Sequence, residues 1–237
     1  MKDPRSYYDD FSRNYDDARS RGYHAHIDDL EADCVRHWLP GPRVLEVGCG
    51  TGQILWRVRG FAPAAVGVDL SGGMLAHARR RGLPVGQASA THLPFRDRSF
   101  DLVYSFKVLP HVPDLEVALA EIVRVLDQGG VALLEFYNPR SLRGLWKRLR
   151  WWSVRVGQAS HDREVFTAYH TPERVRALLP PGTRTIGAGG IVILTPHPLL
   201  HRVPLAGAAL RAAERALCRG PLARFGGFYI VAARKGA

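Results

Sequence analysis

The sequence has little cysteine and no long apolar run. Its three cysteines, Cys34, Cys49 and Cys218, are scattered and odd in number, which excludes a disulfide framework. None of them lies in a CxxC or Cys/His spacing, so we expect a reduced protein without a bound metal. The chain has no run of eighteen apolar residues and no apolar h-region near its N-terminus. We therefore expect a cytoplasmic protein with neither an export signal nor a membrane span.

Acidic residues are scarce in the C-terminal part of the chain. Residues 1–137 hold 16 Lys and Arg against 18 Asp and Glu, a net charge of −2, whereas residues 138–237 hold 17 against 4, a net charge of +13. One interpretation is a basic surface with no specific partner, because a positive field alone gives solubility and weak nonspecific attraction. Nucleic-acid binding is the alternative.

The apolar pattern predicts alternating helices and strands up to residue 137. Amphipathic periodicity indicates helices over residues 28–38, 53–59, 73–81 and 115–126. Short apolar runs indicate strands over residues 44–47, 64–69, 84–87, 101–105 and 131–136, the last after a turn at 127–130. This alternation is typical of a doubly wound α/β sheet with right-handed crossovers.

The rest of the chain is less regular. Residues 138–171 combine aromatic residues with arginine and show no clean strand. Beyond them the pattern predicts two strands, at 186–195 and 228–233, and a helix over 205–218 between them.

Glycine alternates with other residues in VLEVGCGTG, residues 44–52. Glycine allows positive φ and lets a ligand rest on main-chain atoms, and ligands of α/β sheets bind at this kind of strand end. The spacing differs from the dinucleotide and phosphate-loop motifs. Asp69 ends the second predicted strand, where it can accept both hydroxyl groups of a ribose or cap the next helix. Together these features predict a nucleoside-like ligand.

Four motifs follow one another between residues 5 and 137. They are VLEVGCGTG, GVDLSGGML, LPFRDRSFDLVYSFKVLPHVPD and EIVRVLDQGGVALLEF. In this order they resemble the class I S-adenosylmethionine-dependent methyltransferases, in particular the small-molecule group that includes the ubiquinone and menaquinone methyltransferases. The resemblance implies a Rossmann-like, doubly wound sheet of seven strands, mostly parallel with a reversed last strand. It also implies an N-terminal helical lid and an insertion after the fifth strand.

The same resemblance divides a single domain into four parts. These are a lid and helix (1–40), a cofactor-binding core (41–137), a basic substrate-lid insertion (138–183) and the final strands and helix (184–237).

The resemblance implies S-adenosylmethionine as the cofactor. The residues that match cofactor positions are Tyr15, Glu46, Gly48, Cys49, Gly50, Gly52, Asp69, Leu70, Met74, Ser89, Ala90, Thr91, Ser105 and Phe106. Asp69 would hold the ribose, while Leu70 and Met74 would pack on the adenine. Ser89 departs from the family, which often has Asp or Asn there to accept from the adenine amino group. We therefore expect a weaker grip on the adenine.

The methyl group of a sulfonium is already activated, so a general base is needed only for an acceptor that is not ionised. His111, after the fourth strand, and His24, with His26 close by, are the candidate bases, and each has a structural alternative. Lys107 is the third catalytic candidate. It is either a snorkelling surface lysine or the partner of an anionic acceptor, whose ionisation it would favour.

The stretch NPRSLRGLWKRLRWW, residues 138–152, predicts a basic amphipathic helix with tryptophan on its apolar side. This helix either packs on the sheet as part of the substrate lid or touches a membrane surface through residues 140–152. Both interpretations suit a small hydrophobic acceptor.

We expect O- or C-methylation of a quinone-, phenol- or polyketide-like molecule, with no nucleic-acid partner. RNA methylation is an alternative suggested by the arginine content, although no NPPY-like tetrapeptide follows the fourth strand. A noncatalytic cofactor-binding module is the third hypothesis, because fold does not fix function.

Overall fold

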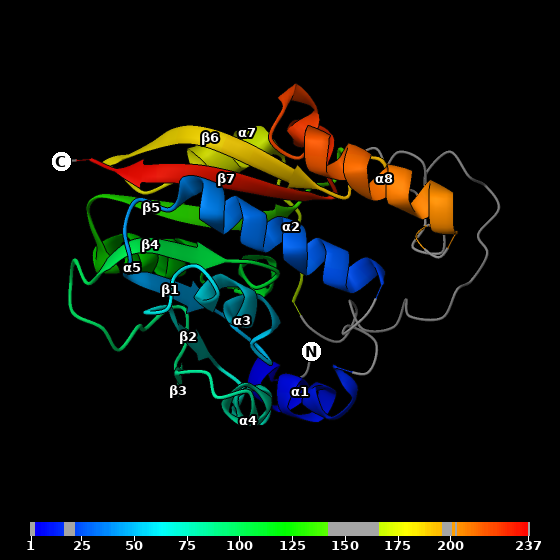
Figure 1. Ribbon diagram of the computed structural model, residues 1–237. Helices are drawn as coiled ribbons and strands as arrows, with labels where there is room; N and C mark the ends of the chain where they lie inside the picture. Colours follow the sequence, from blue (N-terminus) through cyan, green and yellow to red (C-terminus); the bar gives the residue numbers. More distant parts are fainter. Residues whose placement is uncertain (1–2, 17–21, 142–165, 196–200, 202, 237) are drawn as a thin grey trace.

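The computed structural model describes residues 3–16, 22–141, 166–195, 201 and 203–236. Within these residues the chain forms one twisted sheet with helices on both faces (Figure 1). The predicted basic helix lies outside the described residues from position 142 onward, so its two interpretations stay predictions.

The described residues form a sheet of seven strands in the order β3-β2-β1-β4-β5-β7-β6. The strands are β1 (Val44–Val47), β2 (Val66–Asp69), β3 (Val85–Gln87), β4 (Phe100–Ser105), β5 (Leu126–Tyr137), β6 (Thr183–Ile191) and β7 (Phe228–Lys235). The first five strands pair in parallel, and β7 runs antiparallel to both of its neighbours. The predicted Rossmann-like sheet with a reversed last strand is confirmed.

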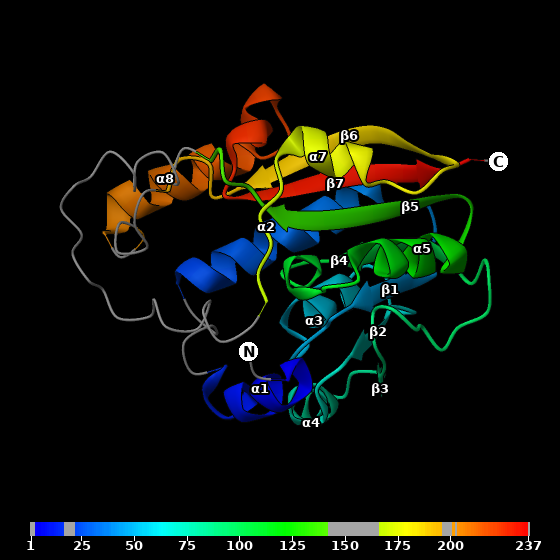
Figure 2. The same cartoon turned by 180° about the vertical axis from the view of Figure 1, so that it is seen from behind.

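Helices cover both faces of the sheet, as the two opposite views show (Figures 1 and 2). Successive strand residues point to opposite faces, so Val44 joins the core beneath one helical layer and Leu45 joins the core beneath the other. The first layer contains α2 (Tyr23–Trp38) and α3 (Gln53–Arg59), and the second contains α5 (Leu115–Val125) and α7 (Pro172–Ala177). The other helical segments are α8 (Pro204–Leu217), η1 (Ser12–Asn14), η2 (Leu109–His111) and η5 (Pro221–Phe225).

An N-terminal helix, α1 (Pro4–Phe11), lies against α4 (Gly72–Arg80). Asp9 holds it there, because its carboxylate accepts hydrogen bonds from Ser71 Oγ at 2.6 Å and from Gly73 N at 2.9 Å. These bonds fix α1 close to the carboxyl ends of β1 and β2, where the predicted ligand would lie.

The predicted bounds of α2 and β6 were wrong. α2 begins at Tyr23 and not at residue 28, because the buried His26 and Ile27 extend its packed face, and histidine is not read as an apolar signal. β6 covers residues 183–191 and not 186–195, because Val192 adopts a φ of +61°, which ends the extended backbone.

The predicted turn at 127–130 lies inside β5 as an irregular bulge. The pairing passes from Phe100 opposite Leu126 to Leu102 opposite Val131, and Gly129 has a φ of +74°. The sequence analysis also missed α7, a helix of six residues that begins after the N-cap Thr171.

Candidate cofactor and acceptor site

A cavity of about 270 Å³ opens at the carboxyl ends of β1, β2 and β4, with α1 forming part of its wall. Most residues that the resemblance assigns to the cofactor line it: Tyr15, Glu46, Gly48, Cys49, Gly50, Asp69, Leu70, Met74, Ser89, Ala90, Thr91 and Phe106. Ser105 and Gly52 are not among the described lining residues. Ser105 is buried, and its hydroxyl donates to Val47 O at 2.9 Å.

The three glycines of the repeat serve different purposes. All of them have positive φ, +81° at Gly48, +53° at Gly50 and +81° at Gly52. A Cβ atom at Gly48 would collide with Val108, and one at Gly52 would collide with Leu83. A Cβ atom at Gly50 would meet nothing within 4 Å. The missing side chain at Gly50 therefore leaves space for a ligand. At Gly48 and Gly52 the space is filled by Val108 and Leu83.

Asp69 is oriented by two backbone groups. Its carboxylate oxygens accept from Gly50 N and from Ser71 N, each at 2.8 Å. Ser71, and not Asp69, provides the side-chain cap of α4, because its hydroxyl accepts from Met74 N at 3.1 Å. Burial raises the pKa of Asp69. Each of its oxygens keeps a lone pair for a ribose hydroxyl, so this geometry fits the predicted ligand.

Glu46 is a buried acid in the cavity wall. Tyr104 donates its hydroxyl to Glu46 Oε2 at 3.0 Å. Burial raises the pKa of Glu46 well above its usual range, and a cation beside the acid lowers it. With Asp69 and the apolar Leu70 and Met74, this side of the cavity fits a cationic nucleoside such as S-adenosylmethionine.

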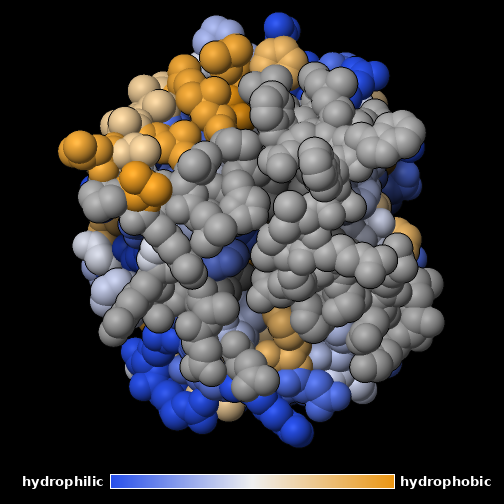
Figure 3. Space-filling model, turned by 90° about the vertical axis from the view of Figure 1, so that its right-hand side faces the viewer, coloured by the Kyte–Doolittle hydropathy of each residue, from blue (hydrophilic) through white to orange (hydrophobic). Residues whose placement is uncertain are grey.

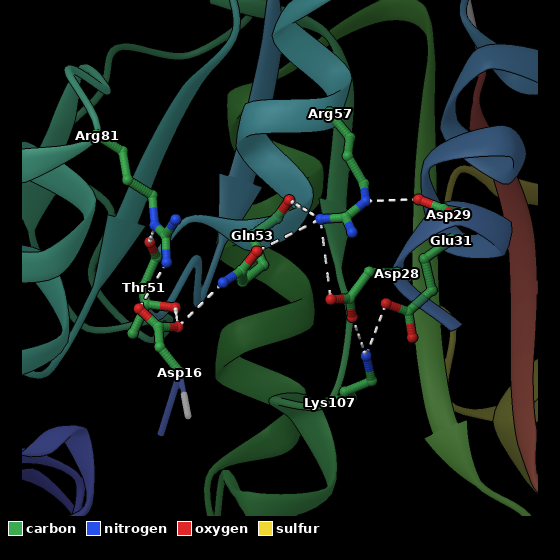
Figure 4. A network of polar contacts seen from close by, with 9 residues as sticks. All are labelled: Asp16, Asp28, Asp29, Glu31, Thr51, Gln53, Arg57, Arg81 and Lys107. Atoms are coloured by element: carbon green, nitrogen blue, oxygen red, sulfur yellow. Dashed lines mark hydrogen bonds and ion pairs between the residues drawn. The ribbon is translucent and has the colours of Figure 1, made fainter. Parts of the chain in front are cut away.

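Asp16 ties the segment after α1 to the core, a role that the sequence analysis missed. Its carboxylate accepts from Thr51 Oγ1 at 2.8 Å, from Gln53 Nε2 at 3.1 Å and from Arg81 Nη2 at 2.5 Å (Figure 4). Thr51 and Gln53 both line the cavity, and so does Tyr15, the neighbour of Asp16 in the chain. We call Asp16 and these three hydrogen bonds the latch. The latch fixes the position of residues that form one side of the cavity.

Asp28 of α2 and Lys107, which follows β4, line another part of the cavity. Glu31 of α2 contacts Lys107 but is not among the lining residues. We call these three side chains the ionic wall. Lys107 Nζ lies 3.2 Å from Asp28 Oδ1 and 2.7 Å from Glu31 Oε2 (Figure 4). Both acids are buried, and the Lys107 side chain is only 16% exposed. The interpretation of Lys107 as a snorkelling surface lysine is therefore wrong.

The backbone holds Lys107 in this position. Its φ of +61° is unusual for a residue with a side chain, and its N–H donates to Glu135 Oε1 at 3.0 Å. Burial, and next the nearby Glu31, raise the pKa of Glu135 well above its usual range. A strained backbone such as that of Lys107 is typical of functional positions.

Only one of the candidate histidines lies at the cavity among the described lining residues. His111 Nδ1 is 3.0 Å from Phe166 O, and its Nε2 is 3.1 Å from the Tyr137 hydroxyl. A carbonyl oxygen can only accept, so Nδ1 carries the proton and Nε2 accepts from Tyr137. Both ring nitrogens of His111 are therefore engaged in hydrogen bonds within the protein.

The N-terminal histidines are placed differently. The rings of His26 and His201 lie 5.7 Å apart, and burial, with His201 as the next cause, lowers the pKa of His26 to about 4. His24 packs edge-on against Tyr23. Neither His24 nor His26 is among the described residues that line the cavity, so the structure does not bring them to the site.

The geometry agrees with what comparison with known proteins finds. Residues 45–134 match the family model described as a methyltransferase domain. Over this segment the chain is similar to methyltransferase domains.

Two curated relatives illustrate the similarity in sequence. A fatty-acid O-methyltransferase from Mycolicibacterium smegmatis is 40% identical over 116 residues, which cover 46% of this chain and 42% of that protein. A ubiquinone/menaquinone biosynthesis C-methyltransferase from Geobacter sulfurreducens is 39% identical over 128 residues, which cover 49% of each. The chain thus spans about half the length, or less, of these curated relatives.

A solved methyltransferase structure from Thermotoga maritima, described as a possible histamine N-methyltransferase, has the same fold. Its TM-score is 0.69 at 22% identity, and the match covers 97% of this chain and 99% of that chain.

The methyltransferase match begins at residue 45, whereas some lining residues of the cavity, among them Tyr15 and Asp28, precede it. Asp16 of the latch and the two acids of the ionic wall belong to this preceding segment. No motif predicted them, and the one available signal was the pair of acids at i and i+3 on a single face of α2.

Proposed function

We propose that this protein is an S-adenosylmethionine-dependent methyltransferase that transfers a methyl group to a small, hydrophobic acceptor by in-line displacement. The observation that carries the proposal is a single cavity with two unlike ends. One end presents Gly50, Asp69 and Glu46, and the other presents apolar side chains together with the ionic wall.

The cofactor end has a partner for each part of S-adenosylmethionine. Asp69 would accept the ribose hydroxyl groups, and Leu70 and Met74 would contact the adenine. Glu46 would face the positively charged methionine part. When bound, the cofactor supplies a methyl group activated by a positively charged sulfur. The protein then has to orient the acceptor and exclude water.

The acceptor end supports a hydrophobic substrate. Val108, Val112, Pro113 and Tyr8 line the cavity beside Lys107 and Asp28. The relatives described above are named for a fatty acid and for ubiquinone or menaquinone. We propose O- or C-methylation of a quinone-, phenol- or polyketide-like acceptor.

Contact with a membrane surface is a related proposal, because a hydrophobic acceptor can reside in a bilayer. Val203 is 50% exposed and Leu205 is 87% exposed, and hydrophobic atoms gather over the start of α8 at the upper left of Figure 3. Within the described residues no helix combines the length and apolar character needed to cross a bilayer. The test is sedimentation with anionic vesicles: binding that falls with salt supports surface contact, and a fully soluble protein contradicts it.

Two measurements test the function itself. Titration calorimetry with S-adenosylmethionine and S-adenosylhomocysteine should give saturable binding. Incubation with the methyl-labelled cofactor and a small-molecule extract of the host should then give a labelled product, identified by mass spectrometry. Binding without any labelled product would favour the noncatalytic alternative, and absence of binding would end the proposal.

A further inference from the structure

A hydroxyl acceptor must lose its proton when it is methylated, and few groups at the cavity can accept one. Glu46 accepts a hydrogen bond from the Tyr104 hydroxyl, and Asp69 accepts from two backbone N–H groups. His111 already uses Nδ1 toward Phe166 O and Nε2 toward Tyr137. Two other carboxyl groups line the cavity: Asp114, which is exposed at the N-cap of α5, and Asp28, which is buried beside Lys107. A buried carboxylate can be fixed before an acceptor arrives, so Asp28 is the candidate.

Asp28 is held firmly in the cavity wall. It lies on α2, one turn before Glu31, and its side chain is 1% exposed. Oδ1 lies 3.2 Å from Lys107 Nζ, and Oδ2 lies 3.9 Å from Nη1 of Arg57 on α3 (Figure 4). Asp28 therefore has a fixed position before any acceptor arrives, which general-base catalysis requires.

The charge of the ionic wall restricts what can bind beside it. Asp28 and Glu31 set two carboxyl groups against the single ammonium group of Lys107, so the acids of the ionic wall outnumber its base. Arg57 does not remove this excess, because it lies between two acids: its Nη1 is 3.9 Å from Asp28 Oδ2, and its Nε donates to Asp29 Oδ1 at 2.7 Å. In a buried site this excess repels an anionic acceptor and attracts a hydrogen-bond donor.

We propose that Asp28 is the general base of this methyltransferase and that its acceptor binds as a neutral phenol or enol, with the O–H group directed at the Asp28 carboxylate. The inference rests on the proposed function and narrows its acceptor class. The acceptor O–H bond breaks and its proton passes to Asp28. The released electron pair, on oxygen or on the conjugated ring carbon, forms the bond to the methyl carbon as the bond between methyl and sulfur breaks and the cofactor leaves as a neutral thioether.

The ionic wall is built to receive one proton. Once Asp28 is protonated, Glu31 and Lys107 remain as a pair of opposite charges 2.7 Å apart, and the wall is neutral. Lys107 acts as a positioning residue, because it holds Asp28 before transfer and stays paired with Glu31 afterwards. An anionic acceptor has already lost its proton, so it would not need a base in this position.

The experiment uses acceptors that share a ring and differ in charge. One series of acceptors consists of neutral phenols, beginning with 1-naphthol, and the other of the matching carboxylates, beginning with 1-naphthoate. Both series are tested at pH 7 with the methyl-labelled cofactor. Methylation of the phenol in preference to the carboxylate is expected. Asp28→Asn should lower kcat by about 10²- to 10³-fold and leave the affinity for S-adenosylhomocysteine within about twofold.

The pH profile separates a base from a structural residue. The groups that face Asp28 are Glu31 on its own helix, Arg57 on α3, Lys107 after β4, and the nearby Glu46 of β1 and Glu135 of β5. The wild-type rate should not follow the ionised fraction of the phenol, because Asp28 removes the proton inside the site. The rate of Asp28→Asn should instead rise steadily with pH, following the ionised fraction of the phenol.

Asp33→Asn is the matched control, because Asp33 lies on the same helix and pairs with the exposed Arg215 at 3.3 Å. It should retain the wild-type rate and pH profile. Asp28→Glu keeps the carboxyl group if Asp28→Asn fails to fold, and it should keep the wild-type pH profile at a reduced rate.

The outcomes distinguish this inference from the proposed function. If S-adenosylhomocysteine does not bind, the methyltransferase proposal itself fails. If it binds but the carboxylate is preferred, if no phenol of the series is methylated, or if Asp28→Asn keeps the wild-type rate and profile, the role of Asp28 is overturned while the cofactor site stands.

Discussion

The two ends of the cavity are built in opposite ways. The cofactor end is made from a short stretch of chain, residues 44–52 together with Asp69, and its geometry depends on backbone groups and on the absence of side chains. The acceptor end is made from side chains 76 and 79 positions apart in the sequence, which meet through charge. A local motif therefore describes the first end, whereas only the folded chain brings the second together.

Substitutions at the two ends should therefore reduce stability or ligand affinity for different physical reasons. At the acceptor end, removing one member of a buried ion pair leaves the other charge without a partner. At the cofactor end, a side chain added to the tight loop collides with its neighbours. The following substitutions sharpen this contrast.

Lys107→Met should have the largest effect on stability. It leaves Asp28 and Glu31 buried without the cation that lies between them, so the free energy of unfolding should fall by about 3–5 kcal/mol. Urea unfolding at pH 7 measures the change. Adding Asp28→Asn and Glu31→Gln to Lys107→Met removes the stranded charges and should restore much of the loss. A single variant within about 1 kcal/mol of the wild type would show that the ionic wall contributes little to stability.

Gly48→Ala should be the most damaging small change at the cofactor end. The new Cβ atom would collide with Val108 while the backbone keeps a φ of +81°, so we expect a loss of about 2–4 kcal/mol and a weaker affinity for S-adenosylhomocysteine. Gly86→Ala on β3 meets nothing within 4 Å and serves as the control in the same unfolding experiment. Equal stability of the two variants would contradict the packing argument.

Asp16→Asn tests whether the latch belongs to the cofactor end. Weakening the charge-assisted bonds from Thr51, Gln53 and Arg81 should reduce the affinity for S-adenosylhomocysteine by about tenfold through faster dissociation. Stopped-flow displacement gives the rate. Asp10→Asn alters an exposed pair with Arg13 at 3.6 Å and should change the affinity less than about twofold. A dissociation rate unchanged by Asp16→Asn would remove the latch from the cofactor site.

Ser89→Asp should have the smallest effect. Ser89 Oγ lies 2.7 Å from Thr91 Oγ1 and accepts from Thr91 N at 3.2 Å, so its hydroxyl is already engaged beside the cavity. A carboxylate there could accept from the adenine amino group, and we expect calorimetry to show binding of S-adenosylhomocysteine tightened by about two- to fivefold. Unchanged affinity would mean that Ser89 does not limit the grip on adenine.

The sequence predicted the parts of the fold that depend on local pattern. β1 and α3 have the predicted bounds, because an apolar run, a glycine repeat and an amphipathic segment follow one another without interruption. The start of α2 and the bulge in β5 were missed, because the first depends on a histidine buried by tertiary contacts and the second on pairing with β4.

The same limit applies to the site. Most residues assigned by resemblance lie around the cavity, since that motif contacts its ligand largely through consecutive backbone groups. Asp28 and Glu31 could be placed on a helix from sequence, but their meeting with Lys107 could not, because it depends on how α2 packs across the sheet. The hydrogen bond from the Ser105 hydroxyl to Val47 O could not be predicted either, because it depends on the pairing of β4 with β1. The predicted backbone contact of Ser105 with the cofactor stays a prediction.

The glycine repeat also indicates where a chemical reporter can be introduced. Gly48 and Gly52 are enclosed by Val108 and Leu83, but Gly50 is restricted only by the handedness of its backbone. Asparagine tolerates that handedness better than other residues with a side chain. Position 50 is therefore the place in the loop where a labelled or photoreactive group could enter the cavity without repacking the protein around it, and report directly on the molecule that occupies it.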